Sequence, residues 1–333
     1  MAACLCIVAF LPVVTISGGP VTAAPADGVH GRHVRVQVLI FNPTLPDQGN
    51  QRLNDYFGWR DPDDITAGLI STFASASDGE ASYAVVDHEV IDEWPVLADG
   101  YAYDEQTWFA CSSDHATCHK PDIVDYLRIL SDHQSCDLRN RGDIDEVWLW
   151  GGPFFGYYES TLAGPGAFTL NSPALSGSSC EELLPIMGFN YERQLPEALE
   201  SYGHRVDDTM KFVYGNGSDN PWHQFTDYDV RAPGRSGCGS VHIPPNGVVD
   251  YDFSNTSVVL SDCDDWPAWP SPPGNFVPVS CATWGCDETG YLTWWLSHVP
   301  RNNGRTDGID NDWWHYILID ARVTRAAWNR LLA

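Results

Sequence analysis

The segment at residues 143–159 constrains the fold of this chain more than any other. It opens with acidic residues, continues as an uninterrupted apolar run at residues 147–150 and then breaks into a Gly-Gly-Pro turn. A short apolar run between turn residues is typical of a buried strand in a parallel sheet. Ligands in open α/β sheets bind beyond the carboxyl ends of such strands, so Glu159, which follows among aromatic residues, is a candidate site residue.

Three further segments have strand character. Residues 34–41 alternate and then become fully apolar, residues 81–91 are rich in β-branched side chains, and residues 183–189 form another apolar run. With residues 147–150 they supply four strands of one core sheet.

Helix signals lie between and after these strands. Residues 61–77 combine an N-cap candidate with apolar residues at helical spacing, residues 121–131 begin with a proline, and residues 191–212 follow the fourth strand directly. Strands that alternate with helices predict an α/β fold, with a mainly parallel sheet flanked by helices over residues 34–213.

The composition changes near residue 214, where the chain becomes rich in Gly, Pro, Asp and Trp. We expect a short apolar segment at residues 258–260, an amphipathic segment at residues 291–296 and a closing strand at residues 314–319. Residues 214–333 are predicted to form an irregular, disulfide-stabilised elaboration. It would pack on the α/β core of residues 27–213 within one domain.

Residues 1–26 have the pattern of a secretory signal peptide. An apolar run is followed by Ala24-Pro-Ala26, which matches the A-x-A cleavage pattern, although no Lys or Arg precedes Arg32. The run is too short, and too interrupted by Pro and Gly, for a good membrane span. We therefore expect a secreted, extracellular protein.

Eight cysteines follow this segment, and an even number in an exported chain suggests disulfides. Metal binding by these cysteines is the weaker interpretation, because no C-x-x-C pair occurs. The two shortest loops and the nearest remaining neighbours give four predicted pairs: Cys111–Cys118, Cys281–Cys286, Cys136–Cys180 and Cys238–Cys263.

The charge balance argues against some partners. The chain has 45 acidic residues against 18 Lys and Arg, a net charge of −27. Nucleic acids and anionic membranes both attract clustered cations, so neither is expected as a partner. A neutral substrate, a cationic substrate and a bound metal ion all remain compatible with this balance, as does surface solubility alone.

The first functional hypothesis is a secreted glycoside hydrolase. Glu159 and Glu192 follow neighbouring strands and could act as acid and base, or as acid and nucleophile, with His204 and His242 orienting them. A solvated loop position for Glu159 and helix capping for Glu192 are the alternatives. The side chains expected to contact substrate are Asn42, Trp150, Phe155, Tyr157 and Asn190.

The second hypothesis is a metal-dependent peptidase or amidase. Glu200 and His204 are spaced i,i+4 on a predicted helix and could reach one zinc ion, with His242 or an Asp as a third ligand. An ordinary ion pair is the alternative, because the spacing is not that of the H-E-x-x-H motif. Gly203 suggests close approach by another element, since a mid-helix glycine costs about 1 kcal/mol relative to alanine.

Other possibilities stay open. The acidic segment at residues 306–312 suggests calcium, but it lacks the spacing of an EF-hand, and Asx-rich turns explain it equally well. No G-x-S-x-G or G-x-x-x-x-G-K motif occurs, which disfavours serine esterases and nucleotide enzymes. A third hypothesis is a non-catalytic glycan-binding protein whose aromatic side chains form the recognition face.

Overall fold

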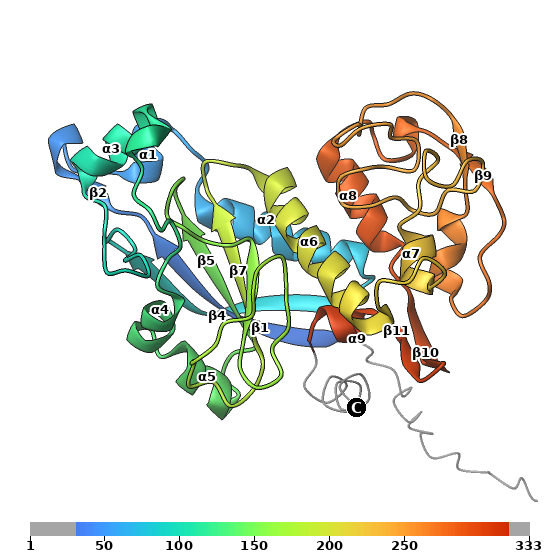
Figure 1. Cartoon of the computed structure of the whole chain (residues 1–333), viewed down its shortest axis with the longest axis horizontal. Helices are drawn as coiled ribbons and strands as arrows, with labels where there is room; N and C mark the ends of the chain where they lie inside the picture. Colours follow the sequence, from blue (N-terminus) through green and yellow to red (C-terminus); the bar gives the residue numbers. More distant parts are fainter. Residues whose placement is uncertain (1–30, 320–333) are drawn as a thin grey trace, which may run out of the picture. The chain divides into compact units, whose positions relative to one another are not determined.

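The computed structural model describes residues 31–319 and centres on a five-stranded sheet (Figure 1). The strand order is β4-β1-β5-β7-β6; the first four strands run parallel, and β6 is antiparallel to β7. This confirms the predicted α/β class and the four predicted strands. The strands are β1 (Arg32–Phe41), β4 (Ala81–Ile91), β5 (Glu146–Gly151), β6 (Ser160–Ala163) and β7 (Leu184–Asn190).

Helices cover both faces of the sheet, with α2 and α6 on one face and α4 and α5 on the other (Figure 1). Every residue of the central strand β5 is therefore buried, which explains its uninterrupted apolar run. The helices of this part are α1 (Leu53–Phe57), α2 (Pro62–Ala76), α3 (Glu105–Ser113), α4 (Tyr126–Asp132), α5 (Ser135–Arg141) and α6 (Leu195–Tyr214). A small ribbon of β2 (Thr44–Leu45) and β3 (Gln51–Arg52) precedes α1.

Two predicted helices begin later than expected because capping residues set their first turns. Helix α4 starts at Tyr126 rather than at residue 121, since the Asp125 side chain accepts a hydrogen bond from the backbone amide of Arg128. Helix α6 starts at Leu195 rather than at residue 191. Gln194 is its N-cap residue, and the backbone amide of Gln194 donates a hydrogen bond to the Glu197 carboxylate in the first turn.

The C-terminal part consists of short elements, and α8 packs against α2 and α6. These elements are α7 (Pro221–Phe225), β8 (Val259–Ser261), β9 (Val277–Val279), α8 (Glu288–Ser297), β10 (Arg301–Thr306), β11 (Ile309–Asp312) and α9 (Trp314–Ile317). The predicted closing strand at residues 314–319 is wrong. Its apolar run forms α9, whose first amide, that of Trp314, donates to the Asp312 carboxylate. Periodicity alone does not separate strand from helix in so short a run.

The acidic segment considered for calcium forms the β10–β11 hairpin. Asp307 and Gly308 take φ values of 52° and 82° between the two strands. Two consecutive residues with positive φ are typical of the tight turn that joins antiparallel strands, for which Asp-Gly is a preferred pair. The hairpin therefore accounts for these residues without an ion.

Many of the tryptophans form core rather than surface. They pack edge to face and stacked on neighbouring rings, as Trp222 does with Phe225 and Trp295. Side chains packed in this way are not available for an exposed aromatic platform. The fully buried indoles are Trp108, Trp148, Trp150, Trp222, Trp266, Trp295, Trp313 and Trp314.

All four predicted disulfides are present: Cys111–Cys118, Cys136–Cys180, Cys238–Cys263 and Cys281–Cys286. Disulfides in this number are typical of proteins that fold in oxidising compartments. The predicted signal peptide at residues 1–26 lies outside the described residues. In the described part of the chain, no helix is long and apolar enough to cross a membrane.

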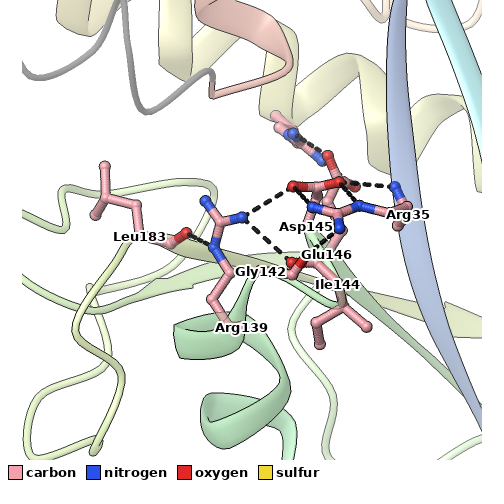
Figure 2. Close-up of polar contacts among 8 residues, drawn as sticks. Arg35, Arg139, Gly142, Ile144, Asp145, Glu146 and Leu183 are labelled. Carbon is pink, nitrogen blue, oxygen red and sulfur yellow. Dashed lines mark hydrogen bonds and ion pairs between the residues drawn. The ribbon is translucent and has the colours of Figure 1, made fainter.

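A polar network closes the amino ends of β1 and β5 (Figure 2). Asp145 accepts hydrogen bonds at 2.9 Å from Arg35 Nε and from Arg139 Nη1, and Arg139 also donates to the carbonyl of Leu183 at the start of β7. These contacts connect β1, α5 and the residues that precede β5 and β7 at one end of the sheet.

The next residue, Glu146, makes a fully buried ion pair. Both of its carboxylate oxygens accept from the guanidinium of Arg205 on α6, at 2.8 and 2.6 Å. Arg205 also donates to the carbonyl of Ile317 in α9 at 2.8 Å. We refer to Arg35, Arg139, Asp145, Glu146 and Arg205 as the amino-end network.

Candidate metal centre

Helix α6 carries two of the predicted ligands on a side that does not face the sheet. Its apolar stripe, which includes Leu199, Tyr202 and Val206, is fully buried. Glu200 and His204 project from another face, with 3.8 Å between Glu200 Oε1 and His204 Nε2. The helical spacing predicted from the sequence thus brings these two side chains together.

Gly203 explains how the third ligand reaches the helix. A Cβ atom added at Gly203 would lie 3.1 Å from both γ-carbons of Val241, so the segment that contains Val241 packs closely against α6. This confirms the close approach predicted from the glycine. The next residue is His242, whose Nε2 lies 3.0 Å from His204 Nε2 and 2.9 Å from Glu200 Oε1.

The three ligand atoms converge on one point. A triangle with sides of 2.9, 3.0 and 3.8 Å has a circumradius of about 1.9 Å, close to the ~2.0–2.2 Å of zinc–nitrogen and zinc–oxygen bonds. A cation slightly out of this plane would contact all three atoms. Glu200, His204 and His242 could therefore hold a metal ion, and they are the one group of this kind within residues 31–319.

Glu159 borders this group from the edge of the sheet. Its Oε2 lies 3.7 Å from His204 Nε2 and accepts a hydrogen bond from Asn171 Nδ2. Glu159 immediately precedes β6, where its carbonyl accepts from the amide of Gly188 in β7. A Cβ at Gly188 would collide with the carbonyl of Tyr158, so the glycine permits this approach. We refer to Glu159, Glu200, His204 and His242 as the α6 cluster.

A cavity of about 200 Å³ adjoins the cluster at Glu159. Three of the predicted substrate contacts, Phe155, Tyr157 and Asn190, line it. Two others do not. Trp150 is fully buried against Phe189, and Asn42 is a buried residue whose amide donates to Asn54 Oδ1. Both therefore contribute to the packing of the fold in this structure.

The structure does not bring Glu192 to the cluster. Glu192 is exposed in the turn before α6, where its backbone amide donates to Asn190 Oδ1 at 2.9 Å. Its predicted carboxylate partner, Glu159, contacts His204 instead. The carboxylate that shares His204 with Glu159 is that of Glu200, on the second turn of α6.

The pKa values of the two carboxylates in the cluster, Glu200 and Glu159, are shifted in opposite directions. Burial disfavours the charge of Glu200, but the nearby His204, the hydrogen bond from Tyr251 and the charge of His242 outweigh it and lower the pKa of Glu200 to about 2. Burial is also the largest effect on the pKa of Glu159, and here the favourable charges nearby do not outweigh it. The pKa of Glu159 is raised above its ordinary value, with Glu200 adding to the shift and His204 opposing it.

His204 lies between these carboxylates. Burial lowers the pKa of His204, but the neighbouring carboxylates of Glu200 and Glu159 more than compensate and raise it above the ordinary value. Within residues 31–319, no Lys or Arg forms an ion pair with Glu159 or Glu200; their ion-pair partners are histidines.

Further carboxylates surround the cluster. Burial, followed by the charges of Glu200 and Glu197, raises the pKa of Glu288 at the start of α8 to about 7, while Arg193 opposes the shift. Glu197 and Arg193 also line the cavity. The negative charge gathered here favours a cation, whether a metal ion or a basic group of a ligand.

Tyr251 is the site residue that the sequence did not reveal. Its hydroxyl donates to Glu200 Oε1 at 2.7 Å, and burial followed by the hydrogen bond to Glu200 raises its pKa to about 12. The neighbouring Asp252, a more conspicuous residue type for a site, instead accepts from the amide of Val248 and stabilises the loop. A tyrosine among acidic loop residues gives no signal in the sequence of where its hydroxyl points.

No protein-family model, no curated protein and no solved structure matches this chain.

Proposed function

We propose that this chain is a metal-dependent hydrolase, of the peptidase or amidase class, that acts on an extracellular polymer. The observation that carries the proposal is the convergence of Glu200 Oε1, His204 Nε2 and His242 Nε2, which lie 2.9–3.8 Å from one another next to a cavity lined by Glu159. Nucleophile and base must lie near a space that admits substrate, and Glu159 belongs to both the cluster and the cavity.

The donor set favours zinc over calcium. Calcium takes six to eight oxygen ligands, whereas two imidazole nitrogens and one carboxylate are a common set for zinc. Catalytic zinc sites typically have three protein ligands and an open fourth position. A bound zinc ion would supply a Lewis acid that polarises a carbonyl oxygen and lowers the pKa of a water molecule.

Glu159 is the proposed general base. Its raised pKa brings the carboxylate nearer to the range in which a group can take up and release a proton. Glu159 would take a proton from the attacking water and deliver it to the leaving nitrogen as the C–N bond breaks. The substrate would lie in the adjoining cavity, against Phe155 and Tyr157.

The decisive experiment is elemental analysis of the purified protein, combined with assays on peptide and glycan panels before and after chelation. We expect about one equivalent of zinc and chelator-sensitive amide cleavage. His204→Ala should lose both the metal and the activity. His119→Ala is the matched control, because His119 is also partly buried and paired with a carboxylate, that of Asp99. A metal-free, fully active preparation would refute the proposal.

One observation favours a second candidate, a glycoside hydrolase that needs no metal. The opposed pKa shifts of Glu159 and Glu200 are those of an acid and a base or nucleophile. Glycan cleavage that resists chelation, and that Glu159→Gln abolishes, would support this candidate. Saturable glycan binding without turnover would instead support a non-catalytic binding protein.

A further inference from the structure

We propose that Tyr251 is a displaceable fourth ligand of the metal centre. Its phenol oxygen would hold the open coordination position in the resting protein and yield that position to water or substrate during turnover. This inference rests on the proposed metal-dependent function and adds a ligand to the same site.

The position of the phenol oxygen is the first argument. Tyr251 Oη lies 2.7 Å from Glu200 Oε1 and 3.4 Å from His242 Nε2. In a tetrahedral site with bonds of ~2.0–2.1 Å, neighbouring ligand atoms are about 3.3 Å apart. The separations among the three candidate ligand atoms are 2.9, 3.0 and 3.8 Å. The distances from Tyr251 Oη to two of these atoms, Glu200 Oε1 and His242 Nε2, are therefore those expected between ligands of one ion.

The backbone of Tyr251 is the second argument. Its φ of 64° lies in the left-handed region, which bulky residues rarely adopt and which is energetically unfavourable for them. The amide of Tyr251 donates to the carbonyl of His242 at 2.8 Å. The base of the loop is fixed by reciprocal bonds, in which the side-chain amides of Asn246 and Asn255 each donate to the other's carbonyl. The loop thus holds an unfavourable conformation that directs the phenol toward the ligands.

The exposure of Tyr251 is the third argument, and it bears on displacement. The side chain is 53% exposed, so leaving the cluster would sacrifice little burial. The loop tip beside it is open as well, with Val248 and Val249 among the most exposed apolar side chains. Besides its backbone conformation, Tyr251 is held by hydroxyl contacts with Glu200 and His242 and by ring contacts with His242 and Phe253. More than half of the side chain stays exposed despite these contacts, so it can move aside without unpacking the core.

On binding of an ion, the O–H bond of Tyr251 would break, its proton would pass to solvent, and the phenolate oxygen would bond to the ion. On entry of water at that position, one water proton would return to the phenolate oxygen as its bond to the ion breaks. No oxidant or reductant is needed.

Copper substitution tests the inference without an activity assay. A phenolate bound to Cu²⁺ absorbs visible light through charge transfer from oxygen to metal. We expect the metal-free protein, loaded with one equivalent of Cu²⁺, to show this band. Tyr251→Phe should bind Cu²⁺ but lose the band. Tyr56→Phe, at a similarly accessible tyrosine on α1, should keep it. Saturating acetohydroxamate should abolish the band in the wild-type protein while copper stays bound.

Each other outcome is informative. Stoichiometric copper without a band in the wild-type protein, or a band that survives Tyr251→Phe, overturns the ligand assignment and leaves the metal centre intact. A band that persists under acetohydroxamate makes Tyr251 a permanent ligand and overturns displacement. If the wild-type protein binds copper and zinc no better than His204→Ala, the metal centre itself fails. Circular dichroism of each variant checks that it is folded.

Discussion

Consecutive residues of α6 belong to two polar regions with opposite properties. Arg205 reaches the amino-end network, where Glu146 and Asp145 are matched by guanidinium groups that stay charged at any physiological pH. His204 reaches the α6 cluster, where Glu159 and Glu200 are matched by imidazoles. The first region is fully buried at Glu146 and Arg205, and the second adjoins a cavity.

The difference suits the first region to a structural role and the second to the proposed metal centre. A carboxylate paired bidentately with arginine has no remaining need for a cation, and its burial holds strands and helix in register. A carboxylate paired with histidine can exchange its partner, because imidazole loses its proton near neutral pH and can then bind a metal. The excess of carboxylates around His204 is what a cation would neutralise.

The largest expected effect concerns the amino-end network. Arg205→Met should lower the free energy of unfolding by about 3–5 kcal/mol, because it leaves the Glu146 carboxylate buried without a charged partner, with only the hydrogen bond from Trp148 Nε1. Urea denaturation of the metal-free protein measures this. The double variant Arg205→Met/Glu146→Leu removes both charges and should recover most of the loss. A single-variant loss below about 1 kcal/mol would contradict the distinction between the regions.

The second prediction concerns the α6 cluster. Glu159→Gln should reduce kcat by about 10²–10⁴-fold, the usual contribution of a general base, while metal content and unfolding free energy stay near wild type. Steady-state kinetics and elemental analysis measure the two quantities. Glu192→Gln is the matched control, since Glu192 lies apart from the cluster, and it should keep its activity. Retained activity in Glu159→Gln would remove Glu159 from the mechanism.

The third prediction follows from the lowered pKa of Asp145. Burial opposes its charge, but the hydrogen bonds and charges of Arg35 and Arg139 prevail. A carboxyl group with a lowered folded pKa stabilises the protein above its ordinary pKa of 3.8, and that stabilisation is lost as pH falls through the lower, folded value. Asp145→Asn should therefore cost about 1.5–3 kcal/mol at neutral pH and progressively less below pH ~4. Urea titrations with EDTA at several pH values test this, and a cost that is constant with pH would contradict it.

The smallest expected effect tests the close packing that assembles the cluster. Gly203→Ala gains about 1 kcal/mol of helix propensity, but the new methyl group presses on Val241 and shifts His242 by a few tenths of an ångström. Zinc affinity should fall several-fold, which competition with a fluorescent chelator measures. Gly203→Ala/Val241→Ala should restore it, because the second change removes the γ-carbons that are in contact. Unchanged affinity in the single variant would show that the segment adjusts without moving His242.

Local patterns predicted much of the fold. Short apolar runs such as residues 147–150 identified the strands, because burial on both faces leaves no polar positions in a central strand. The disulfide pairs followed from proximity along the chain. Local patterns failed where a short run was ambiguous, as in the helix that begins at Trp314, or where a cap replaced an expected first turn, as at Asp125.

For the site, helical spacing was enough to predict the pair Glu200 and His204, because it fixes the relative direction of residues four apart. Gly203 further indicated that another element approaches the helix. His242 and Glu159 were candidates from the sequence as well, but their contact with this pair depends on tertiary packing. The antiparallel pairing of β6 with β7 positions Glu159 beside the cluster. A loop that packs on α6 positions His242 and Tyr251. Contacts between segments so distant along the chain depend on packing, which no local periodicity encodes.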